Sequence, residues 1–235
     1  MNRLKKYQWI LFVLCAHFIS VKVLSQDANS LLEKVKAKLN KVEDYAASGT
    51  MKTDVVFIKI PIAPIESFYV KPDKFQITRK SGVSLLPKGG IGINIGSLIL
   101  TNNYTVIDAG DIVAGRRKLK ILKLIPLSDL SNIVLTTLHV DPLEHLIHKV
   151  STTTRENGTY DLEMFYGRYL SWGLPDKVIF HFNTKDYKLP KGITFEYDDG
   201  TPMKDLPKNK KGKVEIVYNN YTVNKGLGKK ILSAR

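Results

Sequence analysis

The fold is indicated most clearly by the stretch Tyr160-Asp-Leu-Glu-Met-Phe-Tyr166, in which apolar residues recur at every second position. Side chains of a strand point alternately to the two faces of a sheet, so this period predicts a strand with one face kept out of water. Eight further segments have the same period: Val56/Ile58/Ile60, Phe68/Val70, Phe75/Ile77, Leu98/Leu100, Tyr104/Val106, Val178/Phe180/Phe182, Ile193/Phe195/Tyr197 and Val214/Ile216/Tyr218. The sequence therefore predicts a sheet that is apolar on one face.

The connections between these segments predict antiparallel pairing. Glu156-Asn157-Gly158 and Asp198-Asp199-Gly200 are typical of the turns that join two strands of a hairpin. No long helix separates one predicted strand from the next, as parallel crossovers would require. We therefore expect hairpins to dominate the sheet.

Two segments have the period of a helix instead. Ser30 and Glu33 form a capping-box pattern. Apolar residues recur at steps of three and four, which predicts an amphipathic helix over 30–45; they are Leu32, Val35, Leu39, Val42 and Ala46. The period changes again between Pro126 and Ile147, so we expect a helical insert at about 126–148. The residues expected on one face of this insert are Leu127, Leu130, Val134 and Leu138.

The N-terminal segment 1–25 has the order of a secretory signal peptide. Cationic residues precede an apolar run, Trp9 to Ile19, that is shorter than the ~20 residues that a membrane-spanning helix needs. We expect cleavage after Ser25, export to the periplasm of a Gram-negative bacterium, and a single domain over 26–235.

A membrane-anchored lipoprotein acylated at Cys15 is the less favoured alternative. Lipidation requires small residues just before the cysteine, whereas Phe12, Val13 and Leu14 occupy those positions. Cys15 is the only cysteine, so the exported chain would contain none. Such a chain is held together by its core and not by disulfides.

The composition is that of a globular protein with a basic excess. Hydrophobic residues make up 43% of the 235 positions and charged residues 25%, which excludes a disordered chain, a collagen and a disulfide scaffold. The net charge of +14 would suit nucleic acid, but the export signal and the lack of a nucleic-acid-binding motif argue against that partner.

Two motifs after the leading helix carry a resemblance to a known family. Tyr45-Ala46-Ala47-Ser48-Gly49-Thr50-Met51 and then Phe68-Tyr69-Val70-Lys71-Pro72-Asp73-Lys74-Phe75 resemble the start of bacterial outer-membrane lipoprotein carriers, the LolA/LolB-like lipoprotein-sorting family. The strand ending at Asp108 and the segment from Gly212 to Gly226 resemble later strands of the family, and Pro126 to Ile147 lies where the family inserts its lid helices. The resemblance spans about the whole chain after the leader.

This resemblance implies an α+β fold that is mainly β: a curved, incompletely closed antiparallel barrel with an N-terminal helix and a helical lid insert. Its apolar interior would receive the acyl chains of lipoproteins or of another lipid and deliver them to the outer membrane. It also implies transient contact with sorting components of the inner and outer membranes. We expect a monomer, no cofactor and no enzymatic activity.

The resemblance implies roles for three sets of residues: cavity lining, lid face and lid latch. The residues expected to line the apolar cavity are Phe68, Val70, Phe75, Ile77, Leu98, Leu100, Tyr104 and Val106, with a solid core as the alternative. The lid face would be Leu127, Leu130, Val134 and Leu138, with plain packing as the alternative. Lys71 stands where carriers often have an arginine before the proline, which makes it a candidate lid latch, looser than a two-pronged guanidinium.

Two further segments stand out. The cationic string 116–123 offers Arg116, Arg117, Lys118 and Lys120 for contact with anionic head groups; the alternative is an edge strand protected by charge. The glycine-rich segment from Ser81 to Gly96 is interpreted as an extra lid or a membrane-touching loop.

Catalytic and metal motifs give little support to an enzyme. The sequence has no Gly-x-Ser-x-Gly elbow and no paired carboxylates in a setting that tunes an acid and a base. Glu144, His145 and His148, with His139 nearby, do not have the His-Glu-x-x-His spacing, so we expect no metal site. A second hypothesis is therefore also non-enzymatic: an envelope sensor or protein-binding module whose interface is the cationic string and the 81–96 segment.

Overall fold

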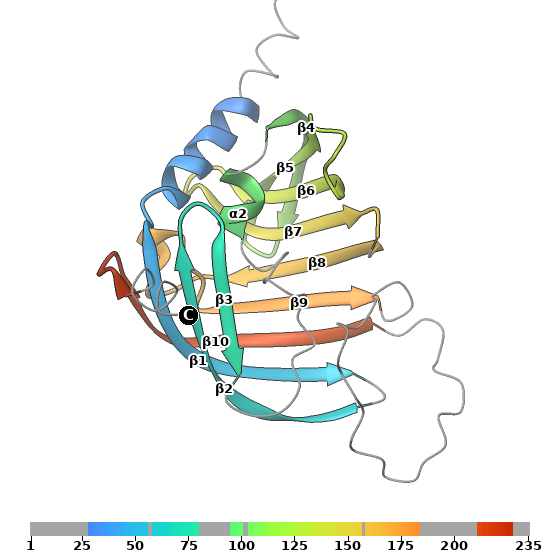
Figure 1. The fold of residues 1–235 in the computed structure, drawn as a ribbon. Coiled ribbons are helices and arrows are strands. Elements are labelled where there is room, and N and C mark those ends of the chain that lie inside the picture. Colours follow the sequence, from blue (N-terminus) through green and yellow to red (C-terminus); the bar gives the residue numbers. More distant parts are fainter. Residues whose placement is uncertain are drawn as a thin grey trace, which may run out of the picture.

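The computed structural model describes residues 28–55, 58–79, 95–100, 103–156, 158–183 and 211–227. Within these ranges ten strands form one antiparallel sheet in the order β3-β2-β1-β10-β9-β8-β7-β6-β5-β4 (Figure 1). The strands are β1 (Asp44–Val55), β2 (Ile58–Val70), β3 (Lys74–Arg79), β4 (Tyr104–Ala114), β5 (Arg117–Pro126), β6 (Ile133–Asp141), β7 (Leu146–Thr154), β8 (Gly158–Phe165), β9 (Lys177–Asn183) and β10 (Lys211–Val223).

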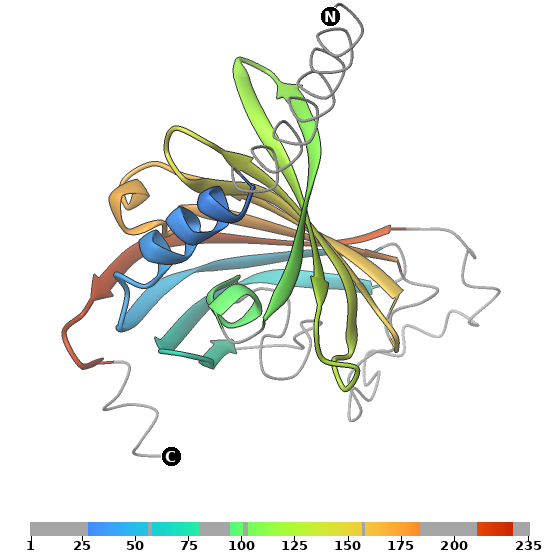
Figure 2. The same cartoon turned by 90° about the horizontal axis from the view of Figure 1, so that it is seen from above.

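The topology is that of an open, curved sheet. Strands adjacent in sequence pair with each other, apart from β3 and β4, and β1 also pairs with β10, so the first and last strands are neighbours within the sheet. The edge strands β3 and β4 do not pair with each other, and the sheet curls without closing (Figure 2). This confirms the expected incompletely closed antiparallel barrel.

The helices lie inside the curve of the sheet (Figure 2). The described part of the N-terminal helix covers 28–39 and buries Leu31, Leu32 and Val35 in the same cluster as the inner faces of the strands. The short helix α2 (Ile95–Leu100) buries Leu98 and Ile99 there. A one-turn 3-10 helix, η2 (Leu170–Trp172), lies in the β8–β9 connection. In the part of the chain that the structure describes, no helix is long and apolar enough to cross a membrane.

Strand register explains why one face is buried. Leu162 of β8 pairs with Phe180 of β9, and Phe180 with Val214 of β10, so these three side chains share the concave face. All three are fully buried. Each large apolar side chain buried in this way contributes about 1.5–3 kcal/mol. The apolar residues predicted at every second position are thus the residues that form the core.

The helical insert expected at 126–148 is wrong. β5 ends at Pro126, and β6 and β7 occupy most of the segment. Thr136, Leu138 and Val140 are all fully buried. Burial at every second position is the pattern of a strand, and it prevails here over the apolar spacing of three and four that favours a helix. Leu127, Leu130 and Val134 are exposed, Leu130 at 97%, and share no face with the buried Leu138. The four lid residues therefore do not form a helical face.

Two other elements differ from expectation. The strand predicted around Leu98 and Leu100 is the helix α2, so the short apolar run did not distinguish a strand from a buried helix. The N-terminal helix is already present at Ala28 and ends at Leu39, because the chain turns and enters β1 at Asp44. The expected signal peptide, most of the glycine-rich segment and the strand at 193–197 lie outside the described residues.

Candidate ligand pocket

An apolar pocket lies between the N-terminal helix, α2 and the concave face of the sheet. Val35 and Leu39 line it from the helix, Ile95 from α2, and Met164 and Val178 from the strands. It is found where β1, β7 and β9 begin and β8 and β10 end, since its walls include Tyr45, Ile147, Val178, Met164 and Tyr221. This end of the molecule is called the helix end below.

The pocket is small. Its volume is about 70 Å³, whereas sites that enclose a drug-sized ligand measure roughly 300–1,000 Å³. Side chains therefore fill most of the space under the helices. In this conformation the part of the interior that the structure describes is close to the solid-core alternative.

Tyrosine rings form the floor of the pocket. The ring centroids of Tyr45 and Tyr69 lie 5.5 Å apart, those of Tyr45 and Tyr221 5.3 Å, and those of Tyr218 and Tyr221 4.9 Å. Burial raises the pKa of Tyr69 and of Tyr218 to about 12, and it raises the pKa of Tyr45 and of Tyr221 well above the usual value. These phenols are uncharged at physiological pH, so the floor is aromatic and neutral.

One cation lies at the pocket and fastens the helix. Lys38 Nζ donates a hydrogen bond of 2.7 Å to the carbonyl oxygen of Glu144, in the β6–β7 turn. That turn is held by Asp141, whose Oδ1 accepts hydrogen bonds from the backbone N–H groups of Leu143 and Glu144 at 2.9 and 3.1 Å. Partial burial lowers the pKa of Lys38. Lys38 thus connects the helix to the opposite wall of the pocket.

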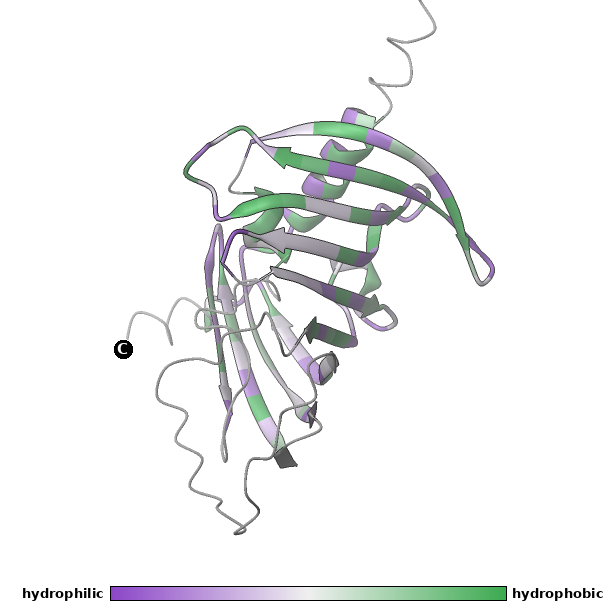
Figure 3. Cartoon of the chain, turned by 90° about the vertical axis from the view of Figure 1, so that its right-hand side faces the viewer, coloured by the Kyte–Doolittle hydropathy of each residue, from purple (hydrophilic) through white to green (hydrophobic). Residues whose placement is uncertain are grey.

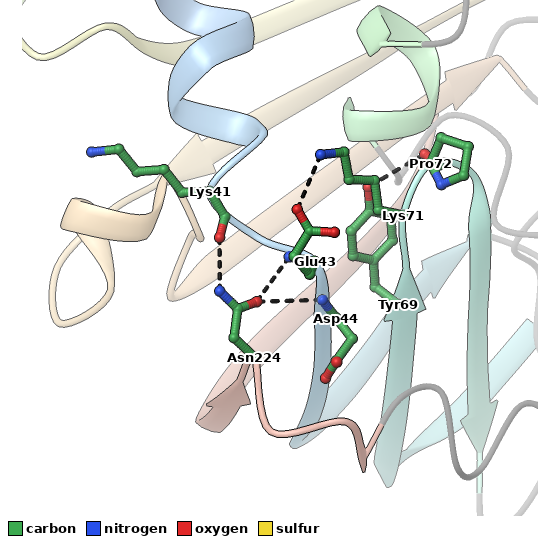
Figure 4. A network of polar contacts seen from close by, with 7 residues as sticks. All are labelled: Lys41, Glu43, Asp44, Tyr69, Lys71, Pro72 and Asn224. Carbon is green, nitrogen blue, oxygen red and sulfur yellow. Dashed lines mark hydrogen bonds and ion pairs between the residues drawn. The ribbon is translucent and has the colours of Figure 1, made fainter.

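A second polar network fastens the turn that follows the helix (Figure 4). The Asn224 side chain accepts a hydrogen bond of 2.8 Å from the backbone N–H of Glu43 and donates one of 2.8 Å to the carbonyl oxygen of Lys41. Lys71 Nζ lies 3.1 Å from Glu43 Oε1. The network connects the turn after the helix with the end of β10 and the β2–β3 turn. Lys71, the predicted latch, therefore contacts the base of the N-terminal helix and not a lid insert.

Five of the eight predicted cavity residues belong to the interior or pack against it, and none of the eight lines the pocket. Those that belong to the interior cluster or pack against it are Phe75, Ile77, Leu98, Tyr104 and Val106. Phe68 pairs with Ala46 and Gln76, so it lies on the opposite face of β2 from Tyr69. Val70 shares that face with Phe68, and Leu100 is not in the cluster.

Sequence reasoning missed the tyrosines and the helix residues of the pocket. In Phe68-Tyr69-Val70 three consecutive residues are apolar or aromatic, so alternation does not show which of them faces the interior. The pairing partner would have distinguished them, because residues opposite each other on paired strands share a face. Tyr69 lies opposite Tyr45, which is buried. Val35 and Leu39 were identified as an apolar helix face, but not as a wall of a pocket.

The cationic string forms the start of β5. β5 lies between β4 and β6, and β4 is the edge strand of the sheet. The string pairs with β6 only from Lys120 onwards, so the edge-strand alternative applies at most to its first strand residues, Arg117 to Leu119. Lys120 Nζ lies 3.1 Å from carboxylate oxygens of both Asp108 and Asp111, and these hydrogen bonds raise the pKa of Lys120. Arg117 lies 2.9 Å from His148 Nε2 and 3.7 Å from an Asp141 oxygen.

The histidines and acids considered for a metal do not converge. Among the residues with described positions, no group of three or more His, Cys, Asp or Glu side chains is placed to hold an ion. Burial lowers the pKa of both His139 and His148. Neutral His148 is suited to accept the hydrogen bond from Arg117.

Comparison with known proteins gives a result only at the level of structure. The sequence matches no family model and no curated protein. A domain assigned to outer membrane lipoprotein sorting in Vibrio parahaemolyticus is 13% identical over 88% of this chain and 100% of its own, with a TM-score of 0.51. A LolA superfamily protein of Nitrosomonas europaea is 11% identical over 87% of this chain and 96% of its own, with a TM-score of 0.53.

A DUF1329 family protein of Desulfovibrio piger is 10% identical over 85% of this chain and 94% of its own, with a TM-score of 0.52. At these identities the similarity establishes the fold alone. The fold is that of LolA superfamily and lipoprotein-sorting domains, as the sequence resemblance implied.

Proposed function

We propose that this protein is a non-enzymatic periplasmic carrier that binds the acyl chains of lipoproteins or similar amphiphiles and delivers them to the outer membrane. The observation that carries the proposal is the apolar concave face of an open sheet, covered by two helices with an apolar pocket between them. The shared fold with a lipoprotein-sorting domain supports it. The acyl chains would lie between the sheet and the N-terminal helix.

The energetics favour reversible exchange between helix and ligand. The helix buries three large apolar side chains, Leu31, Leu32 and Val35, which at about 1.5–3 kcal/mol each contribute on the order of 5–9 kcal/mol. An acyl chain that buries about ten methylene groups gains about 8 kcal/mol. The two terms are similar, so a ligand can replace the helix on the sheet without a large free-energy difference between the two states.

The polar contacts at the C-terminal end of this helix would control its release. Lys38 holds it to the Glu144 carbonyl, and the Lys71–Glu43 ion pair holds the turn that follows it. We assign Lys71 as a latch on the N-terminal helix. The ion pair is partly exposed on both sides, so it would slow opening without making it rare.

The test is native mass spectrometry with lipid analysis on the mature chain purified from an envelope extract. We expect a bound diacyl species or a lipoprotein in stoichiometric amount. A protein that is empty and also takes up no fluorescent fatty acid would contradict the proposal. That result would favour the protein-binding module, because the fold would remain without its ligand.

A further inference from the structure

The β4–β5 hairpin reaches beyond the rest of the sheet. β5 pairs with β4 along its whole length, from Arg117 to Pro126, but with β6 only from Lys120 to Leu124. Residues 111–118, called the hairpin tip below, therefore form a two-stranded extension without a third strand. Figure 2 shows this extension, in bright green, projecting past the neighbouring strands.

The hairpin tip combines exposed apolar side chains with cations. Val113 is 73% exposed and its neighbour Ile112 is also exposed. Arg116, in the turn, is exposed, and Lys118 has a side chain that is 71% exposed. Figure 3 shows hydrophobic and hydrophilic residues mixed along the hairpin. Val113 lies opposite Lys118 on one face of the hairpin, and Ile112, the preceding residue of β4, points to the other face. An exposed aliphatic side chain next to unburied cations is the composition of a segment that lies at a membrane surface.

The acids near the tip leave a positive excess. Asp111 is the only acid within 111–118, against Arg116, Arg117 and Lys118. Lys118 Nζ lies 2.8 Å from Asp111, but an ion pair this exposed contributes little and can be exchanged for a phosphate. Lys120 is not available in the same way, because its side chain is only 20% exposed and lies between Asp108 and Asp111.

Arg117 orients the tip. Its contacts with Asp141 and His148 hold the start of β5 against the end of β6 and the start of β7. In the turn between β6 and β7, Leu143 is 87% exposed. Leu143 therefore adds a further aliphatic side chain at the same end of the sheet. The positions of Arg116 and Lys118 are set by the hairpin tip itself.

We propose that the hairpin tip docks on an anionic phospholipid bilayer by the face that carries Val113 and Lys118, with Val113 entering the boundary between head groups and acyl chains and with Arg116 and Lys118 on the lipid phosphates. β4 ends and β5 begins at the helix end of the molecule, as β7 and β9 also begin there. Docking would bring the helix end, where the pocket lies, towards the membrane. The inference does not depend on lipid binding in the interior.

The test is co-sedimentation of the full mature chain with two kinds of vesicle: phosphatidylcholine alone, and phosphatidylcholine with about one third phosphatidylglycerol. We expect binding to the anionic vesicles only, weakening as salt is added. A cation near the surface changes the affinity about fivefold, so Arg116→Ser with Lys118→Ser should reduce binding about 25-fold. Val113→Glu should reduce it about tenfold or more.

Matched controls separate the tip from net charge and general hydrophobicity. Lys52→Ser with Lys123→Ser removes the same charge from exposed positions outside the tip, and Leu130→Glu changes the most exposed aliphatic side chain at the opposite end of β5. We expect both controls to bind within about threefold of the original protein. Failure to bind anionic vesicles, or equal losses of binding in tip variants and controls, would overturn the proposal. Failure to bind vesicles is also the result expected if the tip binds an acidic protein and not a membrane.

Native mass spectrometry of the tip variants distinguishes this proposal from the carrier proposal. Normal lipid content with lost vesicle binding supports docking by the tip. Normal vesicle binding by an empty protein would contradict the carrier proposal while leaving this one standing.

Discussion

The strands β8–β10 and the hairpin tip contain similar apolar side chains but expose them very differently. Phe180 and Ile216 are fully buried, whereas Val113 faces the solvent at 73% exposure. Both regions are antiparallel strands with good β-forming residues. The difference comes from what lies opposite: helices cover the concave face of the central strands, and nothing among the described residues covers the tip in the same way. Sequence period thus determines strand formation, while a covering element determines burial.

The largest expected effect is the loss of a central side chain. Phe180 is fully buried, with ring centroids of Tyr160 and Phe182 at 5.5 and 5.4 Å. Phe180→Ala should lower the free energy of unfolding by about 3–5 kcal/mol, because it leaves a cavity between these rings. Val113→Ala at the tip is the matched control, with an expected change within about 0.5 kcal/mol. Urea unfolding measures both, and equal losses would mean that the tip is buried.

The part of the fold that sequence could predict follows from the same comparison. The alternation in Val178/Phe180/Phe182 identified β9 and its buried face, because one parity is apolar there. In 126–148 the leucines at helical spacing competed with Thr136, Leu138 and Val140, and only tertiary burial decided for strands. The pocket could not be predicted for a related reason: it depends on how the N-terminal helix packs against the sheet and the β6–β7 turn, a contact between residues far apart in the chain.

The second effect is a loss of stability at alkaline pH. Burial raises the pKa of Tyr69 and of Tyr218 to about 12 in the folded protein, against about 10 for an exposed tyrosine. A raised folded-state pKa gives stability that is complete below pH 10 and is lost as the pH rises towards 12. The fully enclosed Tyr218 should account for roughly 2–3 kcal/mol of that loss, and Tyr69 for less, because it is less deeply buried and solvent screens its charge.

Chemical unfolding at a series of pH values measures the effect, and Tyr218→Phe is its control. The variant keeps the ring in the cluster but has no proton to lose, so its stability should fall less steeply above pH 10. A slope identical to that of the original protein would mean that Tyr218 ionises freely in the folded state.

A third, smaller effect concerns Asn224. Its side chain makes hydrogen bonds with backbone groups of Lys41, Glu43 and Asp44, and its φ of 55° lies in the left-handed region that asparagine tolerates better than most residues. Asn224→Ala should therefore lower the free energy of unfolding by about 1–3 kcal/mol. Asn219→Ala, an exposed neighbour on β10, is the control and should change it by about 0.5 kcal/mol or less. Thermal unfolding measures both variants. Equal stability of the two would mean that the Asn224 side chain does not stabilise the turn after the helix.

The smallest expected change in stability, and the sharpest test of the latch, comes from two similar ion pairs. Lys71–Glu43 at 3.1 Å connects the β2–β3 turn to the base of the N-terminal helix, whereas Lys36–Glu33 at 2.8 Å lies within the helix. Lys71→Ala and Lys36→Ala should each lower the free energy of unfolding by less than about 1 kcal/mol, because both pairs are partly exposed. Only Lys71→Ala should speed the uptake of a fluorescent fatty acid, since only that pair must break for the helix to leave the sheet. If stopped-flow uptake is equally fast in both variants and in the original protein, then the helix opens without breaking the Lys71 contact, and the latch must be sought at Lys38 instead.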